Sequence, residues 1–318
     1  MTVHLISVGL SLRDALHDPR KAFATDRDRL DREEGIAAAM PLAVLDEKQT
    51  GDEVSTWLTA ALSAPGDPGY DATVATRIAD QCRAMSPGLW PPGISAELDT
   101  FHRVAGAGVP LSHDDIAVLI SSDTAPGLVA ALWNAVALTG GDLARVGFLP
   151  DSDAHPGDVR GRALIVRVRG MDAATERGFV TAMRGLGLLG RHLIHRGETR
   201  EGEAVRCYLS GGFKAAIPYL IGLAEGLRSL PETGPVAAYV LHESTASAPI
   251  LLPLRRIAPE RVRKELSSLR WDAPTATEPP SDFLDGYAYE KTPDGWRLTA
   301  FGAGLQALFG IAPPGLLR

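Results

Sequence analysis

The sequence predicts an α/β fold in which helices cover both faces of a doubly wound, mostly parallel β-sheet. Short apolar runs alternate with helical patterns along the chain, as expected for parallel strands joined by crossover helices. With 318 residues, of which 45% are hydrophobic and 22% charged, the chain has the size and composition of one large globular domain or two unequal ones.

Each expected element follows from a local pattern. Apolar runs bounded by polar or glycine-containing turns predict strands at 3–8, 116–120, 163–168, 205–209, 236–241 and 250–254. Helical periodicity predicts helices at 24–40, 71–85, 125–138, 173–194 and 215–227. This order of elements is Rossmann-like, although the charged stretch 20–108, interrupted by proline and glycine, is an atypical helical insertion.

The composition and the pattern of expected elements change near residue 255. A basic amphipathic helix is expected at 256–269, followed by a linker rich in Pro, Thr and Glu. The tail then predicts a hairpin that turns at Pro293-Asp294-Gly295 and a final helix. We therefore divide the chain into a domain of residues 1–255 and a small α+β appendage of residues 256–318. The appendage is either winged-helix-like or a helical lid or dimer arm.

Charge and composition exclude several function classes. The net charge of −7 argues against a broad nucleic-acid-binding surface, although it permits one polyanion in a local basic pocket. No apolar run is long enough to span a membrane, and the N-terminus reads as a strand and not as a signal peptide. Cys82 and Cys207 have no metal or redox spacing, and Cys207 is expected to be a buried, inert thiol. We expect a cytoplasmic protein.

The most informative segment is Ser210-Gly211-Gly212-Phe213-Lys214, which lies between an expected strand and an expected helix. Two glycines there bring backbone N–H groups close to whatever lies above the sheet. The helix N-terminus that follows attracts phosphate, and Lys214 adds a full positive charge. The segment predicts a phosphate-handling turn, while a tight turn with a solvated lysine is the alternative.

Small polar residues follow two other expected strands. They are Ser7-Val8-Gly9-Leu10-Ser11 and Ser121-Ser122-Asp123-Thr124. Because the carboxyl ends of parallel strands share one edge, these residues are expected to meet the glycine turn and bind phosphate or sugar oxygens without a metal. Taken singly, the first segment is equally an ordinary strand-to-helix turn. The second is equally a helix cap in which Ser122 or Asp123 bonds the first helical amides.

Other chemistries fit the sequence poorly. There is no G-x-G-x-x-G after the first strand, no P-loop, no G-x-S-x-G elbow, and no H-E-x-x-H or C-x-x-C motif. His192 and His195 share a helix without an evident third metal ligand, which favours a polar helix face. Arg167 and Arg169 line either a basic pocket or a solvated sheet edge.

Four segments together resemble a known family, the CARF domains of type III CRISPR systems, which sense or cut cyclic oligoadenylates. The resemblance spans about residues 1–255. It is carried by Ser7-Val8-Gly9-Leu10-Ser11, LISSDTAPGLVAALWNAVAL, CYLSGGFKAAIPYLIGLAEGL and AYVLHESTASAPILLPL, of which the Gly-Gly-Phe-Lys segment is the most specific. The sequence departs from the family at Val8, where proline is frequent, and at Phe213, where some ring-cutting members have a basic residue.

The resemblance implies a homodimer that holds a ligand ring on its two-fold axis. It places Ser11 and Lys214 on the ligand phosphates, Gly211 and Gly212 in the backbone cradle, and residues 121–124 on the rim of the pocket. The remaining candidate ligand-binding residues are Ser7, Gly9, Ser210 and Phe213. The implied ligand is a cyclic oligoadenylate, with cyclic tetraadenylate as the expected ring, and neither a metal nor another cofactor is implied.

The residues after the resembling region narrow the class of protein. The resemblance implies that a ribonuclease effector domain would need a histidine in the C-terminal part and that a metal-dependent nuclease would need Glu-x-Lys. No histidine follows His242, and the chain has no Glu-x-Lys, so neither nuclease domain is indicated. A stand-alone ring nuclease is the first expectation, in which Lys214 and Ser11 are catalytic and the ligand's 2′-hydroxyl attacks to leave a 2′,3′-cyclic phosphate. The alternatives are a non-catalytic sensor, a ligand-gated regulator that contacts DNA through residues 256–318, and a nucleotide-binding scaffold outside CRISPR defence.

Overall fold

The structure is a computed structural model. It describes residues 1–17, 49–84, 95–106, 110–172, 175–194, 203–212, 214–241 and 248–312. The helix expected at 24–40 and the side chains of Phe213 and His195 lie outside the described residues.

A single seven-stranded sheet organises the described chain, with the strand order β3-β4-β2-β1-β5-β6-β7. Six strands are parallel, and only the edge strand β7 runs antiparallel to its neighbour. The predicted mostly parallel α/β fold is therefore confirmed. The strands are β1 (Thr2–Ser7), β2 (Ile116–Ser121), β3 (Val146–Leu149), β4 (Ala163–Arg167), β5 (Ala204–Tyr208), β6 (Val236–Val240) and β7 (Ile250–Leu252).

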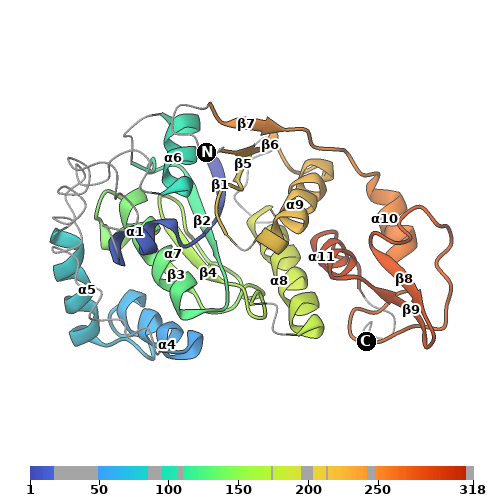
Figure 1. Ribbon diagram of the computed structural model, residues 1–318, viewed down its shortest axis with the longest axis horizontal. Helices are drawn as coiled ribbons and strands as arrows, with labels where there is room; N and C mark the ends of the chain where they lie inside the picture. The colour runs from blue at the N-terminus through green and yellow to red at the C-terminus, as the bar shows by residue number, and fades with distance from the viewer. Residues whose placement is uncertain are drawn as a thin grey trace.

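Helices cover both faces of this sheet (Figure 1). One face is covered by α1 (Ser11–His17), α4 (Gly51–Leu62), α6 (Ala96–Ala105) and α7 (Ala125–Leu138), and α5 (Ala72–Ala84) packs on α4 within the same core. The other face packs against α8 (Glu176–Ile194) and α9 (Ile217–Ser229), and α11 (Ala300–Leu308) packs on these two helices within the same core. The two cores are separate because alternate residues of a strand point to opposite faces.

Strand β2 shows this alternation clearly. Ile116, Val118 and Ile120 enter the core that contains α8 and α9, whereas Ala117 and Leu119 enter the core that contains α7. All six residues of β2 are buried. A central parallel strand covered on both faces needs such a continuous apolar run, which is why the sequence predicted it well.

The order of the strands creates a switch point between β1 and β5. From β1 the chain builds β2, β3 and β4 on one side, then returns to place β5 on the other side of β1. Helix α1 after β1 joins one core, whereas α9 after β5 joins the other. The connections therefore diverge at the carboxyl ends of β1 and β5, where open α/β sheets bind ligands.

The C-terminal residues form α10 (Pro259–Leu266), the hairpin β8 (Tyr289–Thr292) and β9 (Gly295–Leu298), and α11. The hairpin and the final helix agree with the sequence-based prediction. The helix expected at 256–269 is shorter, because it begins with Pro259, a residue suited to a first helical turn.

This C-terminal element packs on the central domain and shares its core. Leu284, Tyr289, Phe301 and Leu305 belong to the same hydrophobic core as Val3 of β1. Helix α11 approaches α8 closely enough that a Cβ added at Gly187 would lie 2.1 Å from the Gly304 carbonyl oxygen. Figure 1 shows α11 against α8, with α10 and the hairpin beyond it.

Within the described residues, no helix is both long enough and apolar enough to cross a membrane.

Candidate functional site

Ser7 fastens the end of β1 to the turn after β5. Its buried hydroxyl donates to the Gly211 carbonyl oxygen at 2.6 Å and to the Tyr208 carbonyl oxygen at 3.2 Å. Both acceptors belong to the β5 side of the switch point. The structure therefore brings two of the three predicted strand-end segments together, and Ser7 serves there as a brace inside the protein.

The turn after β5 is held from two directions. The Ser210 hydroxyl lies 2.6 Å from the Thr100 hydroxyl of α6 and accepts the Leu241 N–H at 2.8 Å. Gly212 has φ +99, a conformation that side chains rarely adopt, so glycine is required there. Among the described residues, none accepts a hydrogen bond from the N–H of Gly211 or Gly212.

Lys214 begins the short 3-10 helix Lys214–Ala216 that leads into α9. It is exposed, and no acidic side chain in the described part of the chain pairs with it. An exposed ammonium group next to amide hydrogens that have no acceptor in the described part of the chain is chemically suited to an anionic ligand.

Glu97 of α6 lies between the two segments that flank the switch point. Its Oε1 accepts the Gly9 N–H at 2.5 Å, and its Oε2 accepts the Ser11 hydroxyl at 3.0 Å. Ser95, the N-cap of α6, donates to the same Oε2 at 2.7 Å. Gly9, a predicted ligand-binding residue, and Ser11, predicted to contact ligand phosphates, thus bind an internal carboxylate in this structure.

The carboxylate of Glu97 also lies against the glycine turn. A Cβ added at Gly211 would be 1.8 Å from Glu97 Oε1, so only glycine leaves room for this side chain. Glu97 is 2% exposed, and no lysine or arginine among the described residues pairs with it. Glu97 is thus a buried carboxylate held by three hydrogen-bond donors, with no cation among the described residues.

The third predicted segment, at the end of β2, is next to β1 in the sheet but is occupied by internal contacts. Ser121 is buried and donates to the Ser122 carbonyl oxygen at 3.1 Å, and the hydroxyls of Ser122 and Thr124 are 2.9 Å apart. The cap of α7 is Thr124, which accepts the Gly127 N–H. The expectation that Ser122 or Asp123 caps this helix was wrong: the helix begins at Ala125 as expected, so its N-cap is Thr124, one residue after Asp123 and two after Ser122.

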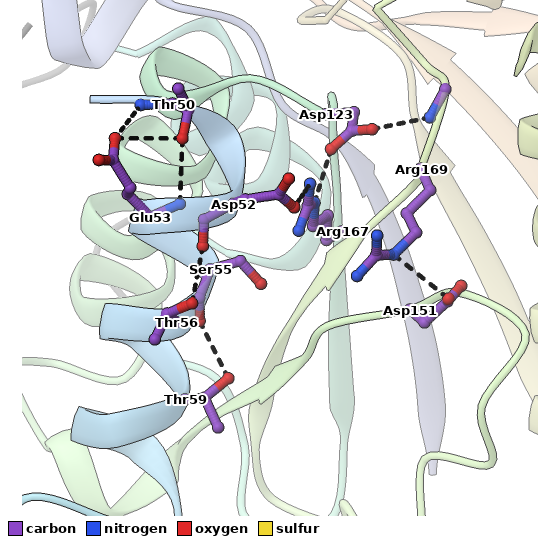
Figure 2. Close-up of polar contacts among 11 residues, drawn as sticks. Thr50, Asp52, Glu53, Ser55, Thr56, Thr59, Asp123, Asp151, Arg167 and Arg169 are labelled. Carbon is purple, nitrogen blue, oxygen red and sulfur yellow. Dashed lines mark hydrogen bonds and ion pairs between the residues drawn. The ribbon is translucent and has the colours of Figure 1, made fainter. Parts of the chain in front are cut away.

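Asp123 is part of a structural ion-pair cluster (Figure 2). It accepts Arg167 Nε at 2.6 Å and the Gly170 N–H at 2.9 Å. Arg167 also donates from Nη2 to Asp52 of α4 at 2.7 Å, and this hydrogen bond lowers the pKa of Asp52. The buried Arg167 therefore joins β4, the end of β2 and the start of α4.

Neither strand-end arginine lines a basic pocket. The side chain of Arg167 is only 5% exposed and is paired with two carboxylates. Arg169 lies beyond the end of β4 and pairs with Asp151 at 3.3 Å, as Figure 2 shows. The anionic-ligand chemistry of the described residues therefore depends on Lys214 and the backbone amides.

The remaining reactive groups add no second site. Cys207 is buried, and burial raises the pKa of its thiol to about 12, in agreement with the expected inert thiol. In the described part of the chain, no three His, Cys, Asp or Glu side chains are grouped so as to hold a metal ion.

The sequence analysis missed the contribution of α6. Ser95, Glu97 and Thr100 all reach the switch point from the stretch that we treated as an atypical insertion. Their only signal in the sequence is Ser95 as a helix N-cap, and nothing local indicates that the glutamate two residues later is buried.

A scan against protein-family models finds no match to this chain, and a search of curated proteins finds no significant similarity.

Proposed function

We propose that this chain binds a cyclic oligoadenylate at the carboxyl ends of β1 and β5 and cleaves it. The observation that carries the proposal is the turn from Ser210 to Lys214. It follows a parallel strand at the switch point, its glycine amides have no acceptor among the described residues, and Lys214 is exposed. This turn also carries the most specific part of the resemblance to CARF domains.

In the proposed reaction, a 2′-hydroxyl of the ring attacks the adjacent phosphate and leaves a 2′,3′-cyclic phosphate. The chemistry depends on in-line positioning, which supplies roughly 7–11 kcal/mol, and on stabilisation of the developing charge. Lys214 stabilises the charge on the phosphorane, the amides of Gly211 and Gly212 act as fixed dipoles, and Ser11 orients the attacking group. Neither a metal nor another cofactor takes part in this proposal.

A ring with rotational symmetry suits two identical subunits that each grip half of it. We therefore propose a homodimer with the glycine turns of both subunits facing one ligand, and cyclic tetraadenylate as the first ring to test. The proposed setting is type III CRISPR signalling in the cytoplasm, where cleavage of the messenger would end the response.

The proposal is tested by incubating the purified protein with cyclic tri-, tetra- and hexa-adenylate in EDTA and following the products by mass spectrometry. Linear fragments with cyclic phosphate ends are expected from at least one ring. Lys214→Ala is expected to abolish them, whereas Lys264→Ala, which removes an exposed lysine of α10, leaves the rate unchanged.

Rings that bind but stay intact would make the protein a sensor and remove the catalytic part of the proposal. Ligand-gated DNA binding has less support, because Arg297 of the winged-helix-like hairpin already pairs with Glu176 and Glu290 at 2.7 Å. A gel shift with and without the ring, at stated salt, tests that alternative.

A further inference from the structure

Glu97 and Ser11 form a linked pair at the proposed site. Glu97 is buried, whereas Ser11 is exposed at the start of α1. Their hydrogen bond, 3.0 Å from Ser11 Oγ to Glu97 Oε2, connects a carboxylate inside the protein with a hydroxyl on its surface. A proton taken up by Ser11 can therefore reach Glu97 without entering the solvent.

The direction of this hydrogen bond determines what Ser11 can offer a ligand. An ionised carboxylate only accepts, so the Ser11 hydroxyl hydrogen points to Glu97. Ser11 Oγ also receives a long contact of 3.4 Å from the Ala96 N–H. The remaining lone pair of Ser11 is an acceptor, which matches a ligand hydroxyl and not a phosphate oxygen.

The charge of Glu97 leads to the same conclusion. Gly9 and Ser11 both contact the carboxylate, and no cation among the described residues offsets its charge. A phosphate at Gly9 and Ser11 would face this negative charge directly. A neutral hydroxyl donor is favoured there instead, while the phosphate is favoured nearer Lys214 and the glycine amides.

We propose that Glu97 is the proton acceptor for the reaction and that it acts through Ser11, an assignment that rests on the proposed function. The 2′-hydroxyl gives its proton to Ser11 Oγ as Ser11 passes its own proton to Glu97 Oε2. The 2′-oxygen lone pair forms the new bond to phosphorus, and the bond from phosphorus to the 5′-oxygen breaks with its electron pair. The 5′-oxygen takes a proton from water, and Glu97 later returns its proton to solvent.

This role separates the effect of Glu97 on binding from its effect on cleavage. The carboxylate opposes the negatively charged ring in the ground state but is required when the proton leaves. Glu97→Gln keeps the shape of the side chain and an oxygen for the Gly9 N–H, yet it removes both the charge and the proton acceptor. It should therefore bind the ring more tightly and cleave it more slowly.

The chain offers a closely matched control. Glu265 is also 2% exposed, and it too accepts one backbone N–H, from Leu284, and two hydroxyls, from Ser281 and Tyr289. It lies in the C-terminal element, away from β1 and β5. Glu265→Gln thus neutralises an equivalent buried carboxylate. It leaves unchanged the proposed transfer of a proton through Ser11 to Glu97, which we call the relay.

The experiment measures two quantities with cyclic tetraadenylate for wild type, Glu97→Gln, Glu265→Gln and Ser11→Ala. They are the dissociation constant and the single-turnover cleavage rate, and circular dichroism confirms folding. For Glu97→Gln we expect a dissociation constant roughly three- to tenfold lower than that of wild type. We expect its cleavage rate to fall by roughly 100-fold or more. Glu265→Gln should match wild type in both, and Ser11→Ala should lose cleavage to a similar degree as Glu97→Gln.

The outcomes distinguish the relay from the proposed function. If Glu97→Gln cleaves the ring at the wild-type rate, the relay is overturned and the proposed function still holds. Loss of both binding and cleavage in folded Glu97→Gln gives the residue a structural role and also overturns the relay. If Glu97→Gln does not fold, unchanged cleavage by Ser11→Ala overturns it. Wild type that binds no ring overturns the proposed function together with the relay.

Discussion

At the scale of single residues, the absence of a side chain at 211 matters as much as the charge at 97. Gly211 has no Cβ, and the space that a Cβ would fill is occupied by the Glu97 carboxylate, 1.8 Å away. Gly212, by contrast, is required for its backbone conformation. The two glycines thus do different work: one makes room for a buried carboxylate, and the other turns the chain.

The first expected outcome concerns Gly211→Ala. The added methyl forces Glu97 out of position, and such overpacking costs about 1–3 kcal/mol of unfolding free energy. Glu97→Ala removes the atoms that the methyl would meet, so the double variant should be more stable than the sum of the two single effects predicts. Urea denaturation of the four proteins measures this coupling, and strictly additive effects would contradict the contact.

A second outcome concerns His4, which is buried under α6 and lies 2.9 Å from the Tyr208 hydroxyl. Burial lowers its pKa from 6.5 to about 4, although Asp115 opposes this shift. The unfolded chain therefore binds a proton that the folded protein rejects, and stability falls as the pH drops from about 6.5 to about 4. The full loss is about 3 kcal/mol.

Urea denaturation between pH 4 and pH 7 measures this dependence. His4→Gln should flatten the curve over that range by removing the titrating group. His113→Gln, at an exposed histidine, should leave the curve as in wild type. An unchanged curve for His4→Gln would show that another group controls acid stability.

At the scale of elements, Arg167 holds the β2 end of the sheet to α4. Its side chain is 5% exposed and bridges Asp123, which is 18% exposed, and Asp52, which is 77% exposed. The pair with Asp123 is the shielded one, whereas the pair with Asp52 is open to solvent and weak. The cluster fixes the segment that we had expected on the rim of the pocket.

The third expected outcome follows from this difference in exposure. Arg167→Ala leaves Asp123 without its cation and should destabilise the protein by about 3–5 kcal/mol. Asp52→Asn should have a much smaller effect, because Asp52 is solvated. Thermal or urea denaturation checks both, and equal effects of the two substitutions would be inconsistent with the assigned roles.

The elements themselves were largely predictable from the sequence. The inner strands are buried on both faces, so their apolar runs stand out, and α7 spans the same residues as expected. Strand β3 was missed because it has only four residues, one of them Gly147, and owes its place to pairing with β4. Short edge strands depend on their neighbours more than on local pattern.

The site was less predictable, for a physical reason that Glu97 and Asp123 illustrate. Strand ends could be found locally, and the topology places those of β2, β1 and β5 next to one another. The side chains that form hydrogen bonds with the strand-end residues come from distant parts of the sequence. Glu97 is 86 residues from Ser11, and Arg167 is 44 residues from Asp123. Pairings at such separations have no signature in a single sequence.

At the scale of the whole molecule, the C-terminal element is packed on the domain that carries the site. Glycines let α11 approach α8, and the core beneath them is continuous with β1. We expect the element to unfold together with the sheet. Far-UV circular dichroism should therefore coincide in urea with the fluorescence of the five tryptophans, of which Trp271 and Trp296 lie in the C-terminal element.

The fourth expected outcome tests this packing. Gly187→Ala pushes a methyl against the Gly304 carbonyl and should lower the stability by about 1–3 kcal/mol. Gly190→Ala, on the same helix, meets only the ends of leucine side chains at 3.1 Å or more and should be neutral or slightly stabilising. Two separated transitions in either variant would contradict a shared core.

The central claim is that the β1–β5 switch point binds a cyclic oligoadenylate through Lys214 and the glycine turn. Isothermal titration calorimetry with cyclic tetraadenylate tests it most directly, using wild type, Lys214→Ala and Lys264→Ala. The account expects one ring per two chains, affinity at least about tenfold weaker for Lys214→Ala, and unchanged affinity for Lys264→Ala. Absence of binding to every ring tested, or binding that Lys214→Ala leaves intact, would contradict it.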